Sequence, residues 1–231
     1  MPHEHRIPMR WADLDSLNHV NNVVYTEYAA EARAAVPGGD PTPRCTESSV
    51  QFKRPILLGR KPVVVTTDVG EDAVFQEIRV EGGDTVFATV ETALTPPPRV
   101  EVVEGVHAAP FTLRRRDLVD GEVTVRNLFE AFQEIRIGFF TTMWRLSAGR
   151  FVVARTDVVE HEPVTWREDL TTRSWIDHVG RSSYTARSQL VADGRVLAHS
   201  TSILVGFDMD TQGSRVLEDS EREAIAQGMR P

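Results

Sequence analysis

The chain has 231 residues, 41% hydrophobic and 26% charged, a composition typical of a globular protein with one large or two small domains. No apolar run approaches the roughly 18 residues of a membrane-spanning helix, and the N-terminal segment lacks the basic and apolar regions of a signal peptide, so we expect a cytoplasmic protein. The lone Cys45 excludes an intrachain disulfide and any cysteine-cluster metal site. A net charge of −8 works against attraction to nucleic acid or anionic lipid, so an anionic ligand would need a local basic patch.

The first part of the chain predicts one helix among several strands. A strand is followed by a loop rich in Asp and Asn, then by a helix that ends at Pro37-Gly38-Gly39. The Pro-rich segment after the last strand cannot continue a strand ladder and reads as a stiff linker. The expected strands are 4–10, 46–54, 61–70, 73–81 and 84–94, the helix is 22–36, and the linker is 95–108.

The same order of elements is expected again after the linker. Glu27, Glu31 and Arg33 recur as Glu130, Glu134 and Arg136, each 103 positions later. The offset grows to 108 at Pro55 and Pro163, and to 110 at Val86-Phe87-Ala88 and Val196-Leu197-Ala198, as duplication followed by small insertions would leave it. The second helix is expected over 124–140, and the strands over 109–116, 151–161, 169–178, 182–192 and 195–208.

Each half therefore predicts a meander of about five strands around one helix, which is an antiparallel sheet in an α+β fold. We expect domains at 1–94 and 109–231, the second with a C-terminal tail, joined by the linker 95–108. The second helix is apolar around much of its circumference, and its phenylalanines are expected to be core side chains or, less simply, the lining of an acyl pocket.

The most informative segment runs from Arg10 to Tyr25 and leads into the first helix. It contains two carboxylates, a histidine and three amides within ten residues. These groups could serve only their own backbone, as Asx-turns and helix caps. Alternatively, a carboxylate just ahead of a helix N-terminus lies beside backbone N–H groups that face a bound ligand, a geometry suited to acyl transfer.

The pattern Asp13-x-Asp15-x-x-x-His19-Val20-Asn21-Asn22-x-x-Tyr25, followed by Glu31-Ala32-Arg33 and Phe52-Lys53-Arg54-Pro55, closely resembles hotdog-fold thioesterases of the 4-hydroxybenzoyl-CoA thioesterase type. It is also similar to the motif of the plant acyl-ACP thioesterases. With the repeat, this resemblance predicts a tandem double-hotdog fold, each half a sheet wrapped around a central helix. It implies a thioester hydrolase of fatty acid metabolism that splits acyl-CoA or acyl-ACP into free acid and thiol.

The resemblance also assigns roles. Asp15 is expected to be the nucleophile or the general base for water. His19, which matches a histidine of the plant enzymes, is the second catalytic candidate. Because a thiolate leaves easily, one carboxylate and a helix N-terminus can suffice, and we expect neither metal nor cofactor. The candidate oxyanion or positioning residues are Asn18, Asn21, Asn22 and Val23, and Tyr25 is a candidate for substrate binding.

The equivalent loop of the second half lies within 114–125, where aligning the helices places Leu118 opposite Asp15 and Glu122 opposite His19. We therefore expect one working site per chain, at the interface of the halves, unless a small shift returns the role to Asp117 or Asp120. The remaining candidates are Arg114, Arg115 and Arg116, which could contact CoA phosphates or a carrier protein or could simply be solvated, and His161, which could face the site or lie on the surface.

Two other functions stay open. A hotdog hydratase or dehydratase would pair Asp15 with His19 for proton transfer on an enoyl or hydroxyacyl thioester. A non-catalytic acyl-thioester-binding protein would keep the fold without the chemistry. For all three functions, the expected partner is an acyl-CoA or acyl carrier protein thioester, and we expect no binding to nucleic acid or membrane. The double-hotdog chains could form a homo-oligomer.

Overall fold

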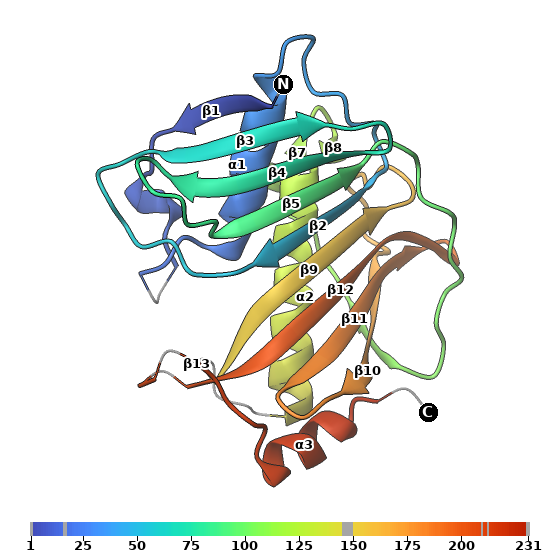
Figure 1. The fold of residues 1–231 in the computed structure, drawn as a ribbon. Coiled ribbons are helices and arrows are strands. Elements are labelled where there is room, and N and C mark those ends of the chain that lie inside the picture. Colours follow the sequence, from blue (N-terminus) through green and yellow to red (C-terminus); the bar gives the residue numbers. More distant parts are fainter. Residues whose placement is uncertain (1, 16–17, 145–149, 209, 212, 230–231) are drawn as a thin grey trace. The chain divides into compact units, whose positions relative to one another are not determined.

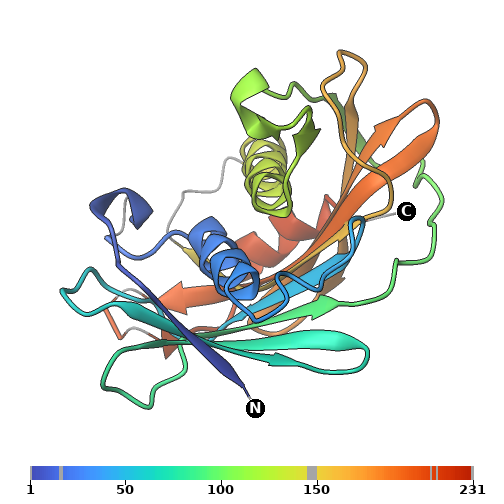
Figure 2. The same cartoon turned by 90° about the horizontal axis from the view of Figure 1, so that it is seen from above.

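The computed structural model describes residues 2–15, 18–144, 150–208, 210–211 and 213–229. The chain divides into two compact units, residues 1–97 (unit 1) and 98–231 (unit 2), with the boundary inside the Pro-rich segment. Each unit places one long helix against its own antiparallel strands (Figures 1 and 2). The α+β prediction of a sheet wrapped around a central helix is therefore confirmed for both halves.

Unit 1 is built around helix α1 (Asn22–Ala34). Tyr25, Tyr28, Ala29 and Ala32 lie one helical turn apart on its buried face, and the two alanines, both 0% exposed, let the helix approach the sheet closely. The side chain of Gln76 reaches from the sheet to the Ala29 carbonyl at 2.9 Å. The strands are β1 (His3–Ile7), β2 (Glu47–Phe52), β3 (Val63–Val69), β4 (Ala73–Val80) and β5 (Ala88–Ala93).

The strand order in unit 1 is β1-β3-β4-β5-β2, with every pair antiparallel. The predicted simple meander is therefore wrong for β2, which pairs with β5, for example Val50 with Val90, rather than with β3. Residues 70–72 join β3 to β4 and residues 81–87 join β4 to β5, so these strands are neighbours along the chain as well as in the sheet. The ten-residue connection 53–62 is long enough to pass from the β5 side to the β3 side. This crossover brings residues 56–57 to the loop that precedes α1.

Unit 2 repeats this order as β6-β10-β11-β12-β9. Its long helix is α2 (Val125–Trp144), and the short strands β7 (Leu118–Val119) and β8 (Glu122–Val123) form a hairpin before it. A further short strand, β13 (Gly213–Ser214), pairs with β12. The main strands are β6 (His107–Pro110), β9 (Phe151–Glu160), β10 (Thr171–Val179), β11 (Ser183–Ala192) and β12 (Arg195–Asp208).

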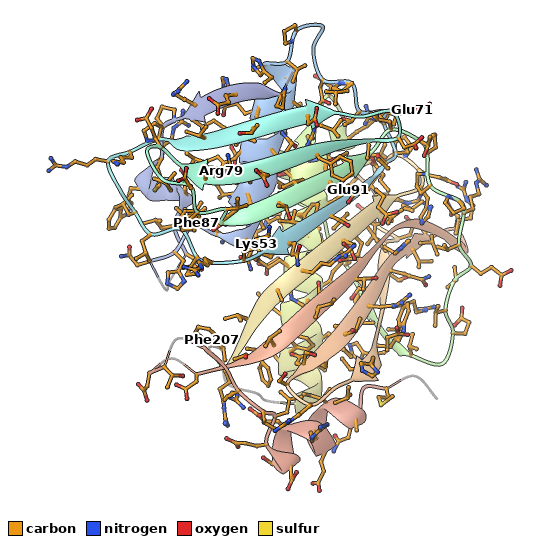
Figure 3. The ribbon with its side chains drawn as sticks, viewed as in Figure 1. Lys53, Glu71, Arg79, Phe87, Glu91 and Phe207 are labelled. Atoms are coloured by element: carbon orange, nitrogen blue, oxygen red, sulfur yellow. The ribbon has the colours of Figure 1, made fainter. Side chains whose placement is uncertain are left out.

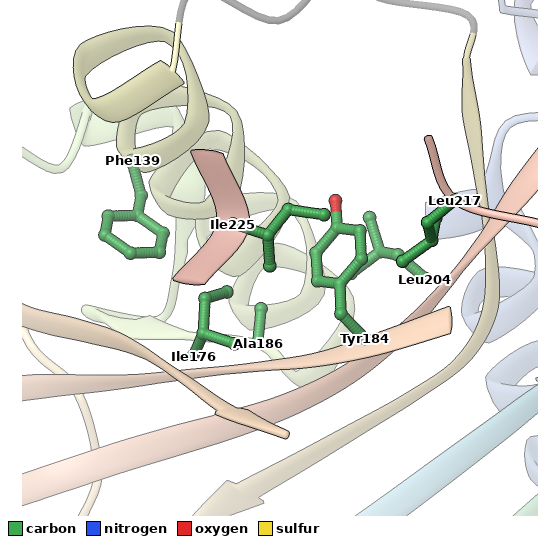
Figure 4. Packing of buried hydrophobic residues seen from close by; sticks show 7 residues of the cluster. All are labelled: Phe139, Ile176, Tyr184, Ala186, Leu204, Leu217 and Ile225. Carbon is green, nitrogen blue, oxygen red and sulfur yellow. The ribbon is translucent and has the colours of Figure 1, made fainter. Parts of the chain in front are cut away.

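The expected C-terminal tail contains a helix, α3 (Asp219–Ala226), which the sequence reading missed. Ile225 of this helix is 0% exposed and packs with Ile176, Tyr184 and Phe139 (Figure 4). Glu221 caps the start of the helix and pairs with Arg215 at 2.7 Å. Helix α3 is thus part of the core of unit 2, and Phe139 of α2 is a core side chain, as the simpler of the two interpretations predicted.

The duplication is visible in the buried polar contacts. Arg33 lies 103 positions before Arg136, and both guanidinium groups are buried. Arg33 Nη1 bonds the Thr92 hydroxyl at 3.4 Å, and Arg136 Nη1 bonds the Ser202 hydroxyl, 110 positions after Thr92, at 3.0 Å. Only the first guanidinium has a described carboxylate partner, Asp40 at 3.1 Å, and burial lowers the pKa of Arg136 to about 10.

Candidate active site

The loop before α1 starts with a 3-10 turn, η1 (Trp11–Asp13). Asp13 closes this turn, because its Oδ2 accepts the Arg10 N–H at 2.7 Å. The same oxygen accepts the Tyr28 hydroxyl at 2.6 Å. Burial and this bond to Asp13 hold the pKa of the Tyr28 phenol well above its ordinary value. Asp13 therefore ties the loop to the buried face of α1 and has a structural role.

Asp15 closes the next part of the loop. Its Oδ1 accepts the His19 N–H at 3.1 Å, and its own N–H donates to the His19 carbonyl at 2.8 Å. Asn18 stands between them with φ of 62°, a left-handed conformation that asparagine adopts more easily than most residues. Asp15 is half-buried and lies seven residues before Asn22, the first residue of α1. Main-chain hydrogen bonds fix its position, as a catalytic carboxylate requires.

The start of α1 supplies the backbone donors. Asn21 is the N-cap, and its side-chain oxygen accepts the Val23 N–H at 3.0 Å. The Asn21 N–H donates to the Asp13 carbonyl at 2.8 Å. Two of the predicted oxyanion donors, the N–H groups of Asn21 and Val23, therefore already have acceptors. The Asn22 N–H has no acceptor among the described residues, so it is the donor best able to receive a ligand oxygen.

Tyr25 connects this loop to the crossover. Its hydroxyl accepts the Ile56 N–H at 3.1 Å, and its ring packs edge-on against Phe52 with centroids 5.3 Å apart. Burial raises the pKa of Tyr25 to about 12, and the negative charge of Asp15 adds to the effect. Tyr25 was predicted to bind substrate, and this role stays a prediction. Its hydroxyl already binds the protein's own backbone at Ile56.

Unit 2 has a loop of the same design but different chemistry. A second 3-10 turn, η2 (Arg115–Asp117), is closed by Asp117 Oδ2, which accepts the Arg114 N–H at 2.8 Å. This is the bond that Asp13 makes with Arg10 in unit 1. Asp117 therefore corresponds to Asp13 and not to Asp15.

The strand-like pairing after η2 fixes the rest of the alignment. Leu14 bridges Val20 in unit 1, and Leu118 pairs with Val123 in unit 2. The position opposite Asp15 is consequently Val119, so the prediction of Leu118 is wrong by one residue, while Glu122 does stand opposite His19. The reason is a loop one residue shorter in unit 2, turned by Asp120 and Gly121 with φ of 54° and 87°.

The other predicted binding residues all lie in unit 2. Arg115 stacks its guanidinium over the Trp166 ring at 4.3 Å, Arg116 lies 3.8 Å from Asp117, and Arg114 caps η2. His161 Nε2 lies 2.9 Å from His199 Nδ1, and the two rings stack. Burial lowers the pKa of both imidazoles, that of His199 to about 4. Their roles toward substrate stay predictions.

Sequence reasoning missed the part played by the crossover. The Ile56 carbonyl accepts the Val20 N–H at 2.8 Å, and Leu57 forms a bridge with His19. The Phe52-Lys53-Arg54-Pro55 pattern marked this segment, but a meander in which the expected strands 46–54 and 61–70 are neighbours could not bring it to the loop. The unit 2 crossover makes the same contact, because the Val164 carbonyl accepts the Val123 N–H at 2.8 Å.

Within the described ranges, no cluster of three or more potential metal-ligating side chains occurs, so these residues offer no metal centre. The same part of the chain contains no helix long and apolar enough to cross a membrane.

Comparison with known proteins gives one match to a family model and several similar solved structures. Residues 1–86 match the acyl-ACP thioesterase C-terminal domain, and a search of the curated proteins gave no match. Similar solved structures include a Lactobacillus plantarum protein described as an oleoyl thioesterase, which is 11% identical with a TM-score of 0.64 and covers 90% of this chain and 96% of its own.

Two further structures are similar over most of the chain. The 12:0-ACP thioesterase of Umbellularia californica is 9% identical, with a TM-score of 0.64 over 89% of this chain and 94% of its own. An acyl-ACP thioesterase of Bacteroides thetaiotaomicron is 11% identical, with a TM-score of 0.57 over 88% and 97%. At these identities the structures show a shared fold, and the family match adds the acyl-ACP type; nothing singles out the 4-hydroxybenzoyl-CoA type. The predicted hotdog fold is thereby confirmed, and the match of residues 1–86 supports the prediction of a thioester hydrolase.

Proposed function

We propose that the chain hydrolyses fatty acyl thioesters of acyl carrier protein at a site in unit 1, with Asp15 as the catalytic carboxylate. The observation that carries this proposal is the placement of Asp15, fixed by the His19 N–H at 3.1 Å in the loop that leads into α1. The match of residues 1–86 to the acyl-ACP thioesterase domain supports the carrier protein as the acyl donor.

In this proposal the thioester carbonyl lies between Asp15 and the start of α1. The Asn22 N–H and the positive end of the helix dipole stabilise the oxyanion that forms when the carbonyl carbon is attacked. The thiolate then leaves with the carbonyl π bond restored, and no metal is required. Asn18 and Asn21 hold the loop and the helix cap in position, because one takes the left-handed turn and the other binds the Val23 N–H.

Asp15 can act in two ways. As a general base it removes a proton from water, and the hydroxide attacks the carbonyl carbon. As a nucleophile its oxygen attacks the same carbon and forms an anhydride, which water then hydrolyses. A single turnover in ¹⁸O-labelled water separates them, because only the nucleophilic route leaves label in the Asp15 side chain when water attacks the aspartyl carbonyl.

The hydratase alternative has less support. It needs the imidazole of His19 and the carboxylate of Asp15 to act as a proton-transfer pair, whereas the hydrogen bond described between the two residues comes from the His19 main chain. The proposed function is tested by incubating the protein with dodecanoyl-ACP and dodecanoyl-CoA and following free thiol with a thiol-reactive dye. Thiol release with dodecanoyl-ACP, abolished in Asp15→Asn, is expected. Absence of release from either substrate would refute the proposal.

A further inference from the structure

Residues 53–61 of the unit 1 crossover carry an unusual concentration of positive charge. Lys53, Arg54, Arg60 and Lys61 are all exposed, and the segment contains no carboxylate, in a chain whose net charge is −8. Both lysines of the chain are among these four residues. Within the part of the chain that the structure describes, none of the four forms an ion pair, unlike Arg6 and Arg79 of the same unit. The charge is therefore available to a partner.

Main-chain hydrogen bonds hold the segment at its start, in its middle and just past its end, where the Pro62 carbonyl accepts the Glu81 N–H at 3.0 Å. The Phe87 carbonyl accepts the N–H groups of Lys53 and Arg54 at 2.8 and 3.1 Å. Ile56 is 1% exposed and is anchored by Tyr25 and Val20, as described above. Lys53, labelled in Figure 3, follows the end of β2. Because the backbone is fixed, the four cations are presented from a stable surface rather than from a free loop, which lowers the entropy lost on binding.

The equivalent segment of unit 2 shows that the fold does not require this charge. Residues 161–169 occupy the same crossover, as the Ile56 and Val164 carbonyls demonstrate by accepting equivalent N–H groups. Their net charge is −2, from one arginine and three carboxylates, against +4 in unit 1. The arginine, Arg167, is bonded to Asp169 and Asp193. The positive charge is thus confined to the unit that carries the motif.

The segment also exposes apolar surface between its two basic pairs. Leu57 and Leu58 are 60% and 38% exposed, and they stand between Lys53-Arg54 and Arg60-Lys61 in the sequence. A free phosphate or nucleotide phosphate needs only the cations, whereas an acidic protein surface with apolar side chains would use both. We propose that residues 53–61 form the docking surface for the acidic protein that carries the acyl thioester.

This inference rests on the proposed function and adds the surface by which the carrier is recognised. Leu57 forms a bridge with His19, four residues after Asp15, so a carrier bound here would deliver its thioester arm next to the candidate site. Opposite charges on the two proteins would speed their encounter, and salt would weaken the effect.

The test compares three full-length double variants, each lacking two positive charges. Lys53→Gln/Arg54→Gln and Arg60→Gln/Lys61→Gln alter the segment, and Arg6→Gln/Arg79→Gln is the matched control from the same unit. Steady-state kinetics at low and high salt are measured with dodecanoyl-ACP and with uncharged dodecanoyl-pantetheine. We expect the segment variants to raise KM for dodecanoyl-ACP about three- to tenfold at low salt, with a much smaller change for dodecanoyl-pantetheine.

A binding measurement keeps docking separate from catalysis. Fluorescence anisotropy of labelled holo-ACP is recorded with the Asp15→Asn protein, with and without the segment substitutions. Weaker ACP binding only in the segment variants supports the inference. If the wild type hydrolysed nothing, that result would refute the proposed function but not the docking surface. Equal losses with dodecanoyl-ACP and dodecanoyl-pantetheine, an equal effect of the control, or unchanged ACP binding would overturn the inference. A membrane role would also overturn the inference. It would be shown if the wild-type protein sedimented with phosphatidylglycerol vesicles, and the segment variants lost this sedimentation while they bound ACP unchanged.

Discussion

Replacing Asp15 by Asn tests the catalytic assignment most directly. The asparagine side chain keeps an oxygen acceptor where Oδ1 of Asp15 accepts the His19 N–H at 3.1 Å, so the loop can retain its hydrogen bond. What is lost is the negative charge and the ability to take a proton or to attack a carbonyl. We expect turnover to fall at least about 100-fold, which corresponds to about 2.7 kcal/mol of transition-state stabilisation.

The same geometry limits the expected effect on folding. Exchanging a charged acceptor for a neutral one weakens a single hydrogen bond, which changes the free energy of unfolding by about 1 kcal/mol. For a chain of this length that is a shift in Tm of about 2–4 °C. Activity and stability should therefore separate clearly, with a large kinetic loss in a protein that melts almost normally.

Thiol release from dodecanoyl-ACP gives kcat and KM, and circular dichroism gives the melting curve. Asp117→Asn is the matched control, because Asp117 also accepts a backbone N–H, that of Arg114 at 2.8 Å, in the equivalent loop of unit 2. If Asp15→Asn melts normally and turns over at a near-wild-type rate, Asp15 is not the catalytic residue.

Three further predictions follow from the same contacts. Asp117→Asn and Asp120→Asn should each retain most of the activity, because the position opposite Asp15 in unit 2 is Val119; a loss as complete as that of Asp15→Asn in either variant would require a second site. Tyr25→Phe should lower the free energy of unfolding in urea by about 1–3 kcal/mol, because it leaves the buried Ile56 N–H without the acceptor it has at 3.1 Å; an unchanged urea midpoint would contradict this. Burial, together with the charges of His161 and Arg187, lowers the pKa of His199 to about 4, although Asp157 opposes the shift. The folded protein therefore keeps this ring neutral, while the unfolded chain protonates it near pH 6.5. The stabilisation is present above pH 6.5 and is lost as the pH falls toward 4, by up to about 3 kcal/mol. The difference in unfolding free energy between pH 7 and pH 5 should therefore be smaller in His199→Gln than in the wild type. An unchanged difference would mean that the ring is already charged in the folded protein.

The sequence by itself determined the repeated order of elements and marked the polar loop before the first helix. The two helices could be aligned through the repeated pattern of Glu27, Glu31 and Arg33. The arginine recurs at a fixed position in each helix because a buried guanidinium needs a polar partner on the sheet. The polar run from Asp13 to Asn22 marked the start of α1, since cap and turn residues act through bonds to their own backbone. Such local interactions are readable from spacing alone.

Only the tertiary structure decided which groups meet. The pairing of β2 with β5 could not be read from the sequence, because an alternating strand pattern does not identify the partner strand. That pairing turns 53–62 into a crossover and brings Ile56 to Tyr25 and Val20. The one-residue shorter loop in unit 2 was equally invisible, since the helices after it align without a gap, and it moves the position opposite Asp15 from Leu118 to Val119. Helix α3 escaped notice because it is short and polar along most of its length, and it is stabilised by burying Ile225 against strands far away in the sequence.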